Sequence, residues 1–163
     1  MEKIEITKKE IVDLYNCLEG LKEVKGSVKF VYAVAKTRLV LKTEVDAIKE
    51  AIVDEPKFLE FEQKRVQMCY EFADKDEKGE TVIDQKLGKF KIEERKEEFA
   101  KEFEKLREEN KEALELQEKR IKEINDMYKE SIEISVHKIN LSDLPDNLNS
   151  VQMEILMPLI LEG

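Results

Sequence analysis

Apolar residues recur at three- and four-residue spacing over two long parts of the chain, 31–73 and 93–128. This spacing is typical of one face of an α-helix, and a narrow stripe is typical of a helix paired with another helix. Pro56 lacks the N–H of a helix interior, so we expect a break near 54–56 and a restart at Lys57. The first seam comprises Val31, Val34, Arg38, Leu41, Val45, Ile48, Ile52, Glu55, Leu59, Glu62, Val66, Cys69 and Ala73.

The second stretch is dominated by Glu, Lys and Arg, and its seam contains one polar residue, Asn110. Asn110 either specifies the register against the first stretch or lies where the seam faces water. Glu55 and Glu62 in the first seam either bind a cation with Asn110 or form ion pairs with Lys or Arg of the second stretch. Arg38 either extends to solvent or pairs with a second-stretch Glu. The second seam comprises Phe99, Phe103, Leu106, Asn110, Ala113, Leu116 or Gln117, Ile121, Ile124 and Tyr128.

The segment between the two stretches contains two short β-prone runs, 81–83 and 90–92, separated by a turn around Gly88. This pattern predicts a β-hairpin over 79–92 at the tip of the helical pair. The alternative is a mobile loop without strand pairing.

The two ends of the chain are predicted to form together a small α/β part, which we call the base. Ile4 and Ile6 alternate with polar residues, as do the residues of 131–136, so the two segments are expected to pair as strands. Thr7 and Glu10 have the spacing of a capping box that opens a short helix. Asn149 or Ser150 is expected to cap a last helix. Its apolar run, 155–161, must be buried on the base or against another chain.

The predicted fold is therefore mainly α with minor β: a long antiparallel helical hairpin, coiled-coil-like, with a β-hairpin at its tip and a small α/β base. We expect a single domain, 1–163, with the base at 1–30 and 129–163 and the arm at 31–128. An unpaired strand edge and an apolar tail favour a homo-oligomer. The candidate interaction residues lie in the hairpin and the last helix: Val82, Ile83, Phe90, Ile155, Leu156, Leu159 and Ile160.

Composition narrows the range of partners. The net charge of −9 argues against direct binding to nucleic acid or anionic membranes. No stretch approaches the length of an apolar membrane helix, and the first residues lack the apolar run of a signal peptide. We therefore expect a cytoplasmic protein. Cys17 and Cys69 are isolated; a disulfide between them is possible, but reduced core residues fit this setting better.

The sequence contains no recognisable catalytic constellation. His137 is the only histidine, and a lone histidine on the polar face of a strand is more often structural than catalytic. The segment from Asp74 to Gly79 resembles the start of a calcium loop, but Gln85 stands where the closing Glu is required. We expect no cofactor, no metal and no enzymatic activity.

Three segments carry a resemblance: 7–21, 70–80 with the acidic helix that follows, and 144–160. In these segments the chain resembles a loose group of small uncharacterised bacteriophage proteins of low-GC Gram-positive hosts. The helix–hairpin–helix plan is also similar to that of prefoldin subunits, whose helices grip clients and whose hairpins assemble; the base elements are additional. We expect a non-enzymatic, phage-encoded protein-interaction protein, chaperone-like or an assembly factor, that acts in the host cytoplasm and binds a phage or host protein. The alternative is an acidic inhibitor of a host or defence nucleic-acid-binding protein.

Overall fold

The computed structural model describes residues 1–161. The chain is mainly helical, at 62%, with small antiparallel β-structure, as the sequence predicted at this coarse level. It divides into two compact units: Met1–Val53 with Glu123–Gly163, and Asp54–Lys122. These boundaries differ from the expected base at 1–30 and 129–163, mainly because the helix that follows residue 27 belongs to the first unit.

A two-stranded antiparallel ribbon runs through the first unit. Strand β1 (Glu2–Thr7) pairs with β4 (Ser131–Val136), with Ile4 opposite Ile134 and Ile6 opposite Ile132. This is the predicted pairing. The alternation places Ile6, Ile134 and Val136 in the core, while Glu133 on the other face is exposed.

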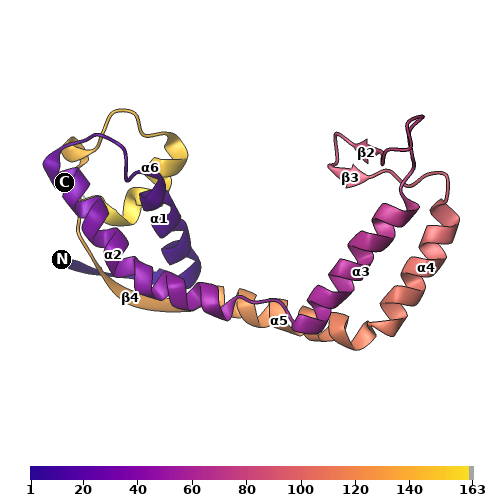
Figure 1. The fold of residues 1–163 in the computed structure, drawn as a ribbon. Coiled ribbons are helices and arrows are strands. Elements are labelled where there is room, and N and C mark those ends of the chain that lie inside the picture. Colours follow the sequence, from indigo (N-terminus) through magenta and orange to yellow (C-terminus); the bar gives the residue numbers. More distant parts are fainter. Residues whose placement is uncertain (162–163) are drawn as a thin grey trace. The chain divides into compact units, whose positions relative to one another are not determined.

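Helix α1 (Lys8–Gly20) begins at the predicted capping box. The Thr7 hydroxyl accepts from the Glu10 backbone N–H at 3.2 Å, and the Glu10 carboxylate accepts from the Thr7 backbone N–H at 2.7 Å. Helix α1 packs against α2 (Val28–Ala51), α6 (Ser150–Leu156) and β1, and α2 also packs against β4. Figure 1 shows these elements gathered together, and their buried side chains form one core. That core includes the fully buried residues Ile11, Leu18, Phe30, Leu41, Val45, Val136, Leu156 and Leu159.

Helix α2 was predicted to belong to the arm, and the structure corrects this. Its buried face contains Phe30, Val34, Leu41 and Val45, all of which lie in the core of the first unit. Val31, the predicted first seam residue, is instead 46% exposed. The predicted apolar seam largely matches the buried face of α2, but this face packs against α1 and β4. Helical periodicity identifies an apolar face and not its partner.

The apolar end of the chain is also part of this core. Helix α6 begins at the predicted cap Asn149, whose side chain accepts from the Gln152 backbone N–H at 2.9 Å. The 3-10 helices η1 (Leu141–Asp143) and η2 (Met157–Leu159) flank α6. The Ile139 backbone N–H donates to the Leu159 carbonyl at 2.7 Å, which fixes the tail to the segment after β4.

The second unit contains α3 (Pro56–Phe72), α4 (Lys96–Glu109) and the first part of α5 (Lys111–Lys129). Pro56 occupies the first turn of α3, where its missing N–H costs no helical bond, so the predicted break is confirmed. Helices α3 and α4 pack against each other, with Phe72 and Phe99 at 5.7 Å between ring centroids. The predicted continuous helix over 93–128 is interrupted at Asn110.

Asn110 has a role that neither sequence hypothesis anticipated. Its side-chain amide donates to the Leu106 carbonyl at 2.8 Å, so it caps the end of α4. Such a bond satisfies one of the carbonyls that a helix end leaves without a partner. Asn110 therefore marks a helix junction rather than the register of a helix pair.

At the ends of α3 and α4, strand β2 (Ile83–Asp84) pairs with β3 (Lys89–Phe90). The pairing is only two residues long, with Ile83 opposite Phe90. Gly79 and Gly88 have positive φ values of 79° and 61°, which L side chains rarely adopt. Further backbone bonds link this segment to Asp74, which accepts from the Val82 N–H at 2.9 Å and donates to the Lys91 carbonyl at 2.8 Å.

Candidate interaction surfaces

An open apolar groove lies along one face of α3, within the second unit. We call it the α3 groove. Leu59, Val66 and Tyr70 are 47%, 47% and 55% exposed, which is high for large apolar side chains in a regular helix. Phe90 of β3 closes one end, with its ring 6.2 Å from that of Tyr70. The full lining is Leu59, Glu62, Gln63, Val66, Gln67, Tyr70 and Phe90.

A second hollow adjoins the α3 groove. Both are lined by Val66 and Phe90, and the second also by Cys69, Ile92 and Phe99. The predicted contact residue Phe90 therefore lies at the centre of an apolar surface. Ile83 is 53% exposed on β2, whereas Val82 is half-buried and its carbonyl accepts from the Lys91 N–H at 3.0 Å.

Charge in the α3 groove is neutralised locally. Arg65 forms a bidentate ion pair with Glu62, in which Nε donates at 2.8 Å and Nη2 at 2.7 Å. The hydrogen bonds that Arg65 donates to Glu62 raise the pKa of Arg65 above its usual value. We expected Glu62 to pair across to the second helical stretch, and that was wrong: its partner lies three residues along the same helix. Arg38 likewise pairs with Glu19 of α1, at 3.3 Å.

The predicted interaction residues at the C-terminal end divide into two groups. Leu156 and Leu159 are fully buried in the core of the first unit, so they are not available to a partner as the sequence suggested. Ile155 and Ile160 are half-buried. Helix α6 has seven residues, most of them apolar or uncharged, and packs against α1.

The described residues contain no group suited to a metal ion: within 1–161, no three His, Cys, Asp or Glu side chains come together. His137 is held by its backbone N–H, which donates to the buried Thr37 hydroxyl at 3.2 Å, and by an edge-on contact with the Tyr32 ring at 5.3 Å. Cys17 and Cys69 are free thiols, and burial raises the pKa of Cys17. Among the described helices, none combines the length and apolar character needed to cross a membrane.

Comparison of the chain with protein-family models, with curated proteins and with solved structures finds no match.

A second exposed apolar surface, which the sequence reasoning missed, lies on α2. Val28, Val31, Tyr32 and Leu39 are 86%, 46%, 54% and 62% exposed, and Ala35 lies among them. These five residues follow the spacing of one helical face. We call them the outer face of α2. The helix is thus apolar on two sides, one facing the core and one facing solvent.

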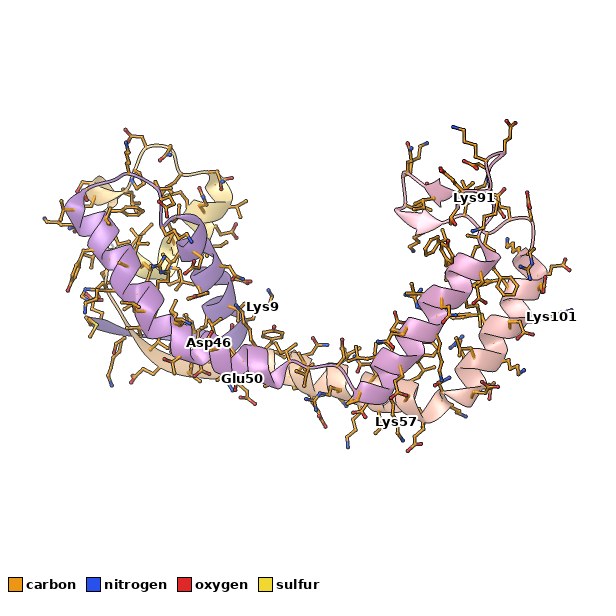
Figure 2. All side chains as sticks on the ribbon, viewed as in Figure 1. Lys9, Asp46, Glu50, Lys57, Lys91 and Lys101 are labelled. Atoms are coloured by element: carbon orange, nitrogen blue, oxygen red, sulfur yellow. The ribbon has the colours of Figure 1, made fainter. Side chains whose placement is uncertain are left out.

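Elsewhere the surface is strongly charged. Figure 2 labels typical side chains, among them Lys9 on α1, Lys57 on α3 and Lys101 on α4, and all six labelled side chains are exposed. Against this charged exterior the α3 groove and the outer face of α2 each present several exposed apolar side chains. Contiguous apolar patches on a soluble surface are typical of interaction sites.

Proposed function

We propose that this chain is a non-enzymatic protein-interaction protein, with a chaperone-like or assembly role, and that the α3 groove is its principal contact for a protein partner. The observation that carries this proposal is the row of exposed Leu59, Val66 and Tyr70 ending at Phe90. Exposed aromatic and aliphatic anchors beside each other are what a partner helix requires.

The proposed arrangement is an antiparallel arm formed by α3 and α4, with the β2–β3 hairpin at its tip. Support comes from the contacts that join the tip to the helices. The Tyr70 and Phe90 rings meet edge-on, and the Lys75 ammonium lies 4.5 Å above the Tyr70 ring. A hairpin anchored in this way extends the helical surface without a hydrophobic core of its own.

The proposed ligand is an amphipathic helix whose apolar residues recur every three or four positions. Leu59, Val66 and Tyr70 follow that spacing themselves, so ridges of a partner helix can pack between them. The Glu62–Arg65 pair is internally neutral and does not favour a charged ligand. A phage origin, a cytoplasmic location and a homo-oligomeric state belong to this proposal as further expectations.

The direct test uses a fluorescent amphipathic peptide of Leu and Gln, which carries no charge, and measures its binding to the full chain by anisotropy. Val66→Glu places a charge in the middle of the α3 groove and is expected to weaken binding by about tenfold or more. Val151→Glu is the matched control, because Val151 is an exposed valine on α6, outside the α3 groove.

Two results would overturn the proposal. One is the absence of binding to the uncharged peptide. The other is an equal loss in the Val66→Glu and Val151→Glu variants, which would mean that the peptide binds without using the α3 groove.

A further inference from the structure

The distribution of charge along the chain singles out α2. Residues 24–43 contain five of the 29 Lys and Arg residues and none of the 38 Asp and Glu residues. The remainder of the chain therefore carries a net charge of −14, whereas this segment carries +5. A block of one sign in a chain of the opposite sign points to an interaction with a charged partner.

The cations border the outer face of α2 on both sides. Lys29 and Lys36 are seven residues apart on one border, and Arg38 and Lys42 are four apart on the other. Arg38 and Lys42 are engaged with Glu19 and Asp46, at 3.3 and 3.0 Å. Of the five cations in 24–43, the other three, Lys25, Lys29 and Lys36, are exposed, and their ammonium groups have no ion-pair or hydrogen-bond partner among the described residues.

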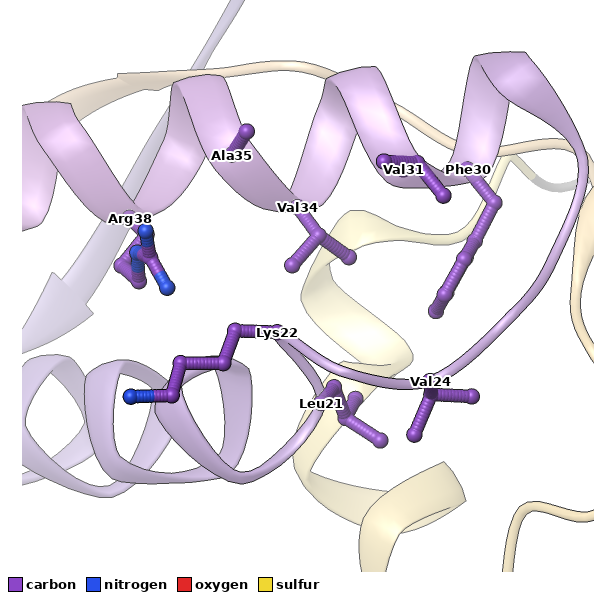
Figure 3. A pocket seen from close by; sticks show the side chains of 8 residues that line it. All are labelled: Leu21, Lys22, Val24, Phe30, Val31, Val34, Ala35 and Arg38. Atoms are coloured by element: carbon purple, nitrogen blue, oxygen red, sulfur yellow. The ribbon is translucent and has the colours of Figure 1, made fainter.

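A small pocket opens beside this face. It lies between the start of α2 and the end of α1 with the loop that follows, and Val31, Ala35 and Arg38 belong to its lining (Figure 3). Its volume of about 50 Å³ is room for one aliphatic side chain. Apolar walls from Leu21 and Val34 face each other, and the charged ends of Lys22 and Arg38 lie at one side.

We propose that the outer face of α2 binds an acidic amphipathic helix of another protein. The apolar stripe of that helix would cover Tyr32 and Leu39, one aliphatic side chain would enter the pocket, and its carboxylates would pair with Lys29 and Lys36. Apolar contact supplies most of the free energy of such an interface, and charge complementarity selects the partner.

Other occupants fit less well. A second copy of the same face would bring the lysines of the two copies together, since a two-fold interface joins identical patches. An anionic bilayer or nucleic acid would meet the net charge of −14 on the rest of the chain. An acidic helix of limited length avoids that repulsion because it contacts α2 alone.

This surface belongs to the first unit and is independent of the α3 groove, so the two proposals fail separately. The probe is a labelled peptide with Leu at helical spacing and Glu on both flanks, compared with a second peptide in which Lys replaces every Glu. Phosphatidylglycerol vesicles and duplex DNA are measured alongside. The full chain should bind the Glu peptide, and less tightly as salt rises, because surface charges are screened.

The variant Lys29→Glu/Lys36→Glu should weaken Glu-peptide binding by about tenfold or more, and Leu39→Gln should weaken it as well. The matched control is Lys64→Glu/Lys105→Glu, which makes the same charge change at exposed lysines of α3 and α4 and should leave binding unchanged. Circular dichroism establishes that each variant is folded.

Any of four results would overturn the proposal: no binding of the Glu peptide, equal binding of both peptides, equal loss in the control variant, or binding confined to vesicles or DNA. Loss of uncharged-peptide binding in Val66→Glu tests the α3 groove alone and is independent of these four results.

Discussion

The carboxylate of Asp74 accepts a hydrogen bond from the backbone N–H of Glu93, with a distance of 3.1 Å. The same oxygen accepts from the Glu94 N–H, also at 3.1 Å, and Asp74 is only 9% exposed. One side chain thus joins the segment that follows α3 to the residues that precede α4. The tip segment between them, which carries Phe90 of the α3 groove, is closed at its base by these bonds.

Asp74→Ala should therefore destabilise the second unit by about 1–2 kcal/mol, because two part-buried backbone N–H groups lose their partner. Hydrogen exchange at Glu93 and Glu94, together with urea unfolding, measures the effect. Asp76→Ala is the matched control: Asp76 accepts from Lys78 and Glu80, but these groups are exposed and water can replace it. Equal exchange rates at Glu93 in Asp74→Ala and in the unmodified protein would contradict the assigned role.

Gly26 is packed against the core. A Cβ built on Gly26 would lie 2.7 Å from Cδ1 of Phe30, whose side chain is fully buried. Gly26→Ala should lower the free energy of unfolding by about 1–3 kcal/mol, since the ring cannot withdraw without displacing its neighbours. Gly20→Ala is the control, because nothing lies within 4 Å of a Cβ there, and it should be neutral or stabilising by up to about 1 kcal/mol. Thermal unfolding that ranks the two variants in reverse order would refute the packing argument.

The hydroxyl of Thr37 is the polar group that links α2 to the segment after β4. Thr37 is fully buried, and replacement by Val keeps its shape while removing the acceptor of the His137 N–H. Thr37→Val should cost about 1–3 kcal/mol. Exchange of the His137 amide should accelerate in Thr37→Val and stay slow in Thr37→Ser, which keeps the hydroxyl. Rapid exchange in both variants would show that the methyl group matters and the hydrogen bond does not.

The capping box of α1 should make stability depend on pH. The Thr7 backbone N–H, and then the Thr7 hydroxyl, hold the pKa of Glu10 below its ordinary value of 4.5. As the pH falls, the unfolded chain therefore takes up this proton first. Above the unfolded pKa, Glu10 makes its full contribution to the free energy of unfolding. It is lost as the pH falls through the lower, folded value.

The measurement is the difference in unfolding free energy between the unmodified protein and Glu10→Gln, followed from pH 7 down. Gln can still accept from the Thr7 N–H, so the difference reports the lost charge, should be about 0.3–1 kcal/mol at neutral pH, and should shrink as the pH falls below about 4.5. Glu23→Gln, at an exposed loop position, controls for the lost charge alone. A difference that stays constant down to the acid transition would exclude a role for the Glu10 carboxylate.

Local patterns alone determined a good part of this protein. The pair Thr7 and Glu10 specifies a helix cap, and Pro56 specifies a helix start. The alternation around Ile4 and Ile134 specifies which face of each strand is buried. Each of these signals depends on residues that are near neighbours in sequence. The structure confirms all three. The outer face of α2 could also have been predicted from the sequence, because residues 24–43 contain no acidic residue. The assignment of a single apolar seam did not use that signal.

Tertiary structure decided which elements and side chains each apolar face and each charged side chain contacts. Periodicity shows that a helix has an apolar side, but many surfaces satisfy that side equally well, and only the packing of the chain selects one. It placed α2 on α1 and β4, put Leu156 in the core, and gave Glu62 a partner on its own helix. The sequence therefore determined which residues avoid water, and the fold determined which of them are left exposed for another molecule.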